Sequence, residues 1–155
     1  MHPTPIRLPN RPPVSIRLPL DFTAFCQLRH TPYRRHALLR LGETAAADRA
    51  VEHALGTLAT DWRRILSSRC PARRAWQILT ASIEHQIRHQ TSAPPTAARA
   101  LYTLLPARQA DAMLLHLQHV PPHQAADLTG LDTTMHAYHL CTAQHTLDAR
   151  LAPAP

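Results

Sequence analysis

Histidine is the residue type whose number and spacing could most readily support chemistry, because twelve are present in 155 residues. Imidazole binds zinc when three or four ligands converge, often together with cysteine thiolates. Several histidines recur at helical spacing, namely His85 with His89, His136 with His139, and His116 with His119 and His123. The last group is interrupted by Pro121 and Pro122, and only Cys141 is a nearby cysteine. We therefore expect no metal site, and histidines that are solvated or that face bases.

Patterns of catalytic residues are missing from the sequence. It contains no Gly-rich phosphate loop, no nucleophile elbow and no paired carboxylates, so we expect neither an enzyme nor a cofactor. The cysteines Cys26, Cys70 and Cys141 are odd in number and form no CxxC pair. We expect them to be small apolar residues in a reducing compartment rather than a disulfide framework.

The charge of the chain is divided unevenly between its two parts. The formal net charge is +7, and every basic residue is Arg. Residues 1–90 carry 14 Arg against 6 acids, whereas residues 91–155 carry 3 Arg against 4 acids. The first part could hold a polyanion such as nucleic acid, and the second could not do so by charge alone at neutral pH. No apolar run approaches the roughly 20 residues of a membrane span, and no hydrophobic leader is present, which predicts a cytoplasmic protein without a membrane partner.

Composition predicts an all-α fold that follows a proline-rich arm. Ala, Leu, Arg, Gln and His dominate and only 3 Gly occur, which favours helices over sheets. Residues 1–20 contain six prolines and the tetrapeptide IRLP twice, at 6–9 and 16–19. Because proline removes donors and fixes φ, we expect an extended or disordered arm here. The repeat is either a docking motif or part of a basic low-complexity tail.

Apolar periodicity places three helices in a first domain, residues 21–90. The first helix runs from an N-cap at Asp21 to a stop at Gly42, with a kink or a split at Pro32. The second begins after Glu43 and Thr44 and continues through Trp62 until the break at 67–71. The third covers residues 73–90.

Shorter helices follow a linker at residues 91–96 and form a second domain, residues 97–151, before a tail at 152–155. Gly130 lies where a helix-turn-helix has its turn. The expected helices are 97–104, 107–119, 122–129 and 133–150.

Ordered motifs over roughly residues 22–150 resemble a sigma-70-type RNA polymerase sigma factor of the extracytoplasmic-function type. In the second domain these are LP-x-R-Q at 105–109, the A-x-L-x-G turn at 126–130, and a long final helix. In the first domain they are LLRLG at 38–42, ATDWRRI at 59–65, and RAW at 74–76. The resemblance implies a three-helix bundle similar to region 2 and a helix-turn-helix similar to region 4.

In that family, region 2 binds the coiled coil of the polymerase β′ subunit and opens the −10 element, while region 4 binds the β flap and reads the −35 element. By resemblance, the residues facing core polymerase are Asp48, Arg49, Glu52 and His53. Those facing −10 DNA are Arg73, Arg74, Trp76, Arg88 and His89. Arginine neutralises phosphate and an aromatic ring can stack on an unpaired base. Alternatively, Trp76 belongs to the core and the arginines form a solvated face.

The final helix departs from the family pattern, because Arg150 is its only basic residue. His136, Tyr138, His139 and Gln144 could contact bases, but the phosphate contacts that duplex binding needs are missing. If they are exposed, the histidines of this domain would add positive charge on acidification.

Several alternatives remain open from the sequence. The chain is a sigma factor, a degenerate sigma-like regulator that acts by protein contact, or a generic helix-turn-helix protein. An anti-sigma factor is a further possible partner.

Overall fold

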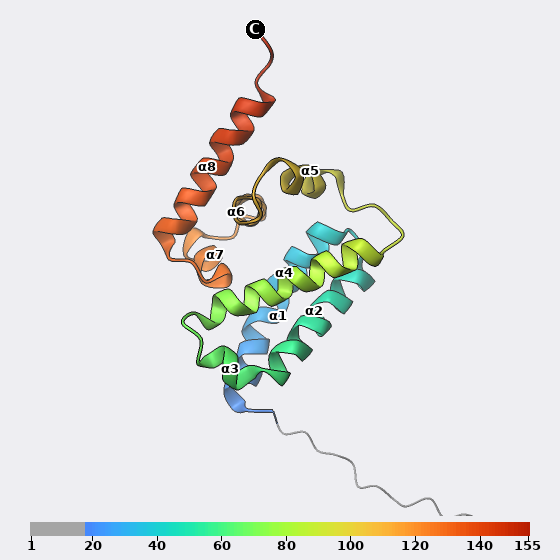
Figure 1. The fold of residues 1–155 in the computed structure, drawn as a ribbon, viewed down its shortest axis with the longest axis vertical. Coiled ribbons are helices and arrows are strands. Elements are labelled where there is room, and N and C mark those ends of the chain that lie inside the picture. Colours follow the sequence, from blue (N-terminus) through green and yellow to red (C-terminus); the bar gives the residue numbers. More distant parts are fainter. Residues whose placement is uncertain (1–17) are drawn as a thin grey trace, which may run out of the picture.

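The computed structural model describes residues 18–155, and within them the protein is all-α, which confirms the predicted class. Residues 1–17 of the expected arm lie outside the described residues. The helices, drawn in Figure 1, are α1 (Leu20–Leu41), α2 (Thr44–Thr60), α3 (Trp62–Leu66), α4 (Pro71–His89), α5 (Thr96–Leu104), α6 (Ala107–Leu117), α7 (Pro122–Thr129) and α8 (Thr133–Leu151). No helix in this range is long and apolar enough to cross a membrane.

Helix α1 continues through Pro32, so the chain is not split there. It ends where Gly42 adopts a left-handed conformation with φ of 78° and donates its N–H to the carbonyl of Leu38. The expected second helix is shorter than the sequence predicts. Helix α2 stops at Thr60, and Trp62 begins the separate short helix α3.

The main core lies where α1, α2 and α4 pack together. Helix α2 presents a face of small residues to its neighbours, and these allow close approach of the helices: Ala46, Ala47, Ala50 and Ala54, all fully buried. Larger side chains such as Tyr33, Leu79 and Ile83 fill the remaining space. At the α3 end, Phe22, Trp62 and Ile65 form a smaller apolar cluster with Ala75 of α4.

The C-terminal helices complete this core instead of standing apart from it. Leu115 of α6 and Ala125 and Leu128 of α7 belong to the same buried cluster as α1, α2 and α4. A second cluster joins α5, α6 and α8. A helix-free segment lies between α4 and α5, and the two groups of helices that it connects pack on one another.

Candidate nucleic-acid interface

Five exposed arginines gather at one end of the first group of helices. They lie on α3, on the turn after it and on the first turn of α4, and are Arg63, Arg64, Arg69, Arg73 and Arg74. We call them the arginine cluster. The inward side of α3, Trp62 and Ile65, packs against Ala75 of α4. This packing holds α3 beside the start of α4 (Figure 1). The arginines of both helices therefore belong to the same end of the first group of helices.

The arginine cluster has charge available for an external partner. In the part of the chain that the structure describes, the arginines in ion pairs are Arg29, Arg34 and Arg40, and none of them belongs to the cluster. Sequence reasoning found two members of the cluster, Arg73 and Arg74, and missed the other three. Five arginines within the twelve positions 63–74 were the signal that could have identified them.

The turn between α7 and α8 contacts Arg73 of the arginine cluster. The carbonyl of Gly130 accepts hydrogen bonds from Arg73 Nε at 3.3 Å and from Cys70 Sγ at 3.4 Å. Gly130 has φ of 71°, and a Cβ at this position would lie 2.2 Å from the backbone nitrogen of Arg73. Only glycine permits this approach. The α7–α8 turn therefore contacts the first turn of α4.

Trp76 does not lie on the surface, and its assignment as a stacking platform for DNA is wrong. Its side chain is 5% exposed, and its ring lies against His36 with centroids 4.6 Å apart and against Tyr33 at 5.9 Å. Its Nε1 donates a 2.9 Å hydrogen bond to Asp111 on α6. The residue also lines a pocket of about 200 Å³ between α4, α6 and α7, but its ring is packed against α1.

The remaining predicted DNA contacts on α4 are exposed but lie apart from the cluster. Arg88 and His89 are at the far end of the helix, about 22 Å from Arg73 along its axis at 1.5 Å per residue. There the ring of His89 stacks on that of His85, and His85 in turn faces His53 of α2. A residue predicted to face DNA thus adjoins one predicted to face polymerase.

The four predicted polymerase contacts on α2 differ in whether their side chains form hydrogen bonds or ion pairs within the protein. Asp48 accepts a 2.6 Å hydrogen bond from Arg34 Nε in an ion pair, and Arg49 donates to Gln86 at 3.4 Å. His53 Nδ1 lies 3.1 Å from the hydroxyl of Ser82. Glu52 is exposed and forms no hydrogen bond or ion pair with the described residues. Glu52 is therefore the freest charged group on this face.

Helix α8 offers two of its four predicted base contacts to solvent. Tyr138 is 60% exposed and Gln144 is exposed. His136 is only 2% exposed, so its assignment to DNA is wrong. His139 is half-buried, and both of its ring nitrogens are covered. Burial lowers the pKa of each of these histidines. The helix begins at Asp132, whose side chain accepts a 2.7 Å hydrogen bond from the N–H of Met135.

Across residues 18–155, no three His, Cys, Asp or Glu side chains are grouped in a way that would hold a metal ion. Cys26, Cys70 and Cys141 are free thiols. The chemistry that the arginine cluster supports best is the binding of a polyanion by guanidinium groups.

No protein-family model, no curated protein and no solved structure matches the chain.

Proposed function

We propose that the chain is a sigma-like transcription protein that associates with core RNA polymerase and contacts promoter DNA mainly through the arginine cluster. The observation that carries the DNA part is the exposure of five arginines, without ion-pair partners in the described residues, at the α3–α4 end. Guanidinium groups that neutralise phosphates release counterions, and this release supplies most of the sequence-independent affinity for nucleic acid.

Support for polymerase association comes from the resemblance to region 2 and from the surface of α2. Arg49, Glu52 and His53 are all exposed on that helix, and Glu52 has no partner in the described residues. Charged groups of this kind at the rim of an interface set its specificity and its association rate. Glu52 is accordingly the residue whose charge reversal tests polymerase binding.

The DNA proposal is tested by replacing Arg63 and Arg64 together with Gln in the full chain. Fluorescence anisotropy with a single-stranded and a duplex 20-mer gives the affinity as a function of salt. We expect the slope of log K against log salt to become shallower by about 1.4 for the single strand and about 1.8 for the duplex. The matched control replaces Arg99 and Arg150, which are exposed on the C-terminal helices. Equal slopes for both double variants would refute a DNA contact through the cluster.

Polymerase association is tested by co-purification of purified core polymerase with the full chain and with its Glu52→Arg variant. We expect the variant to retain several-fold less polymerase than wild type. Asp148→Arg makes the same change of charge at an exposed position on α8 and should leave retention unchanged. Full retention by Glu52→Arg would count against this face as the contact.

A second candidate is a regulator that binds polymerase through α2 without reading a promoter. It is favoured by α8, whose exposed Tyr138 and Gln144 carry no charge and whose one arginine, Arg150, lies in its last turn. Run-off transcription separates the two candidates. A sigma-like initiator produces transcripts with core polymerase, whereas the regulator is retained by polymerase and produces none.

A further inference from the structure

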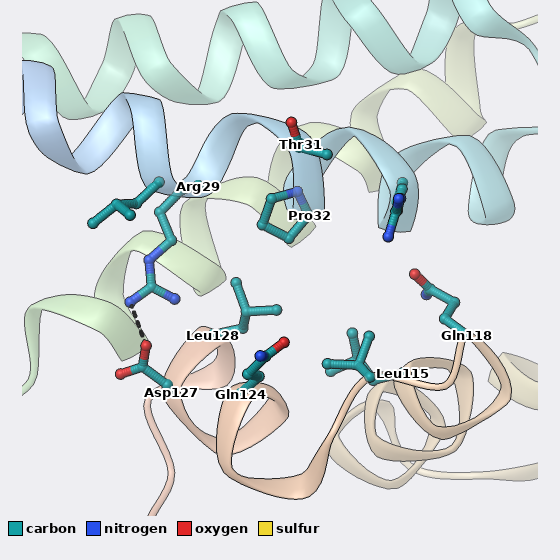
Figure 2. A pocket seen from close by; sticks show the side chains of 11 residues that line it. Arg29, Thr31, Pro32, Leu115, Gln118, Gln124, Asp127 and Leu128 are labelled. Carbon is teal, nitrogen blue, oxygen red and sulfur yellow. Dashed lines mark hydrogen bonds and ion pairs between the residues drawn. The ribbon is translucent and has the colours of Figure 1, made fainter.

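A cavity of about 450 Å³ opens between α1 and the α6–α7 region. Figure 2 shows Pro32 of α1 on one wall and Leu115 and Leu128 of the C-terminal helices on the other. Leu28 and Val120 also line it. The volume lies within the range of about 300–1,000 Å³ that small-molecule sites occupy, and apolar walls are usual for such sites.

Two arginines of α1 line this cavity, and they differ in their pairing. Arg29 forms an ion pair with Asp127 of α7 at 3.3 Å, drawn as the dashed line in Figure 2, and its guanidinium lies 5.5 Å from the centroid of the Phe25 ring. Arg35 is exposed and has no ion-pair partner among the described residues. The site therefore holds two positive charges and one negative charge, and the uncompensated charge is that of Arg35.

One polar group beside the cavity lacks its usual partner. The side-chain nitrogen of Gln118 is covered by protein atoms and makes no hydrogen bond with the described residues, and Figure 2 shows this side chain directed toward the space between the two walls. Buried polar groups in native proteins are nearly always paired, and a turn of this amide toward the cavity would let a bound molecule supply the missing partner.

We propose that this cavity binds a small organic monocarboxylate with an apolar body. The carboxylate would accept hydrogen bonds from Arg35 and, once its amide turns toward the cavity, from Gln118, and the body would lie against Pro32, Leu115 and Leu128. A single negative charge matches the single uncompensated positive charge, whereas a phosphate dianion would be repelled by Asp127.

Such a ligand would contact α1 and the C-terminal helices together. Because a ligand that binds only the folded form stabilises it by mass action, occupancy should raise the melting temperature of the chain. This binding requires none of the arginines of the arginine cluster, so it stands or falls independently of DNA binding.

The test is calorimetric titration of the full chain with octanoate, and with octanamide as a neutral compound of the same shape. We expect saturable binding of octanoate at one site and much weaker binding of octanamide. Arg35→Gln should weaken octanoate binding about tenfold or more, the usual effect of losing a hydrogen bond to a charged group. Arg64→Gln, which removes the same charge from the exposed surface of α3, should leave octanoate binding unchanged.

A second variant tests the location of the site. Gln124 is exposed and lines the cavity, so Gln124→Trp should fill the space and abolish octanoate binding while the melting temperature of the free protein stays within a few degrees. Three results would overturn the proposal: no saturable binding of octanoate, equal losses in Arg35→Gln and Arg64→Gln, or undiminished binding by Gln124→Trp. Tighter binding of octyl phosphate than of octanoate would overturn the assignment to a monocarboxylate.

Discussion

The indole N–H of Trp76 on α4 donates a 2.9 Å hydrogen bond to the carboxylate of Asp111 on α6, and this bond joins the two groups of helices. The hydroxyl of Tyr102 on α5 donates to the other carboxylate oxygen. His36 of α1 lies 3.7 Å from the same carboxylate. Burial raises the pKa of Asp111, while its hydrogen bonds with Tyr102 and Trp76 act in the opposite direction. Asp111 is thus the polar centre of an otherwise apolar contact.

Replacing Asp111 with Leu should destabilise the protein, because the N–H of Trp76 and the hydroxyl of Tyr102 would both lose their acceptor in a buried place. Each unpaired buried group costs about 1–3 kcal/mol, so we expect the free energy of unfolding to fall by about 2–5 kcal/mol. Asp111→Asn keeps one acceptor oxygen and should lose less. Urea denaturation followed by tryptophan fluorescence measures both changes. Asp148→Asn on the exposed face of α8 is the control, and a Leu variant as stable as this control would contradict the assignment.

Stability should also depend on pH through His36. Complete burial lowers the pKa of His36 from 6.5 to about 3, with the nearby Arg40 acting in the same direction. A histidine whose pKa is lowered on folding contributes stability that is complete above its unfolded pKa and is lost as the pH falls. Between pH 7 and pH 4 the loss should be about 3 kcal/mol.

The variant His36→Phe isolates this dependence. Phenylalanine keeps a ring against Trp76, and no hydrogen bond is lost because neither ring nitrogen of His36 has a partner. Its stability should fall less on acidification than that of wild type. The opposite contribution of Asp111, whose raised pKa favours the folded state as the pH falls, is present in both proteins. His30→Gln, an exposed change on the same helix, should follow wild type; if His36→Phe does so too, His36 is not the group responsible.

Helix ends were largely predictable from the sequence, because their signals are local. The left-handed cap at Gly42 and the turn at Gly130 are set by residues within a few positions of the helix terminus. The predicted N-cap at Asp21 is wrong, because α1 begins at Leu20 after Pro19 and Asp21 lies in its first turn. The separation of α3 from α2 was missed, since no glycine or proline marks the break at Asp61.

The faces of the helices were less predictable, because an apolar stripe does not say what covers it. Trp76 was assigned to DNA by resemblance, but Tyr33 and His36 of α1 pack against its ring and Asp111 of α6 accepts its N–H. These partners lie 35 to 43 positions away in the sequence, and no local pattern encodes their contacts. His136 has exposed residues on both sides of it in α8, so its burial is a property of the assembled fold.

Gly130 and Gly56 provide a matched pair of substitutions by alanine. At Gly130 a Cβ would lie 2.2 Å from the backbone of Arg73, and φ is 71°, so we expect Gly130→Ala to lower the free energy of unfolding by at least about 2 kcal/mol. At Gly56, inside α2, a Cβ would have no neighbour within 4 Å. Gly56→Ala should therefore stabilise the protein by about 0.5–1 kcal/mol. Thermal melts by circular dichroism measure both, and equal effects would contradict the close approach of the turn to α4.

Acidification should not affect all histidines of the C-terminal helices equally. The sequence suggests that acidification charges the histidines of the C-terminal helices and raises DNA affinity. Burial lowers the pKa of His136 and of His139, and for His136 the charges of His139 and His116 lower it further. These two side chains should therefore stay neutral at lower pH than an ordinary histidine, whose pKa is about 6.5. We therefore expect His136 and His139 to contribute little to any gain in affinity, whereas His116, His119 and His123 are exposed.

Anisotropy titrations of duplex DNA with the full chain at pH 7.5 and pH 5.5 measure that gain. The double variant with Gln at 136 and 139 should gain as much affinity on acidification as wild type, provided its melting curve shows that it is folded at both pH values. The triple variant with Gln at 116, 119 and 123 should gain less affinity, because it has lost three exposed imidazoles that could contact phosphates. Each phosphate contact that it loses should also make the salt slope shallower by about 0.9. Loss of the gain in the double variant alone would mean that α8 turns its buried histidines toward DNA, and that the covered arrangement is not the one that binds.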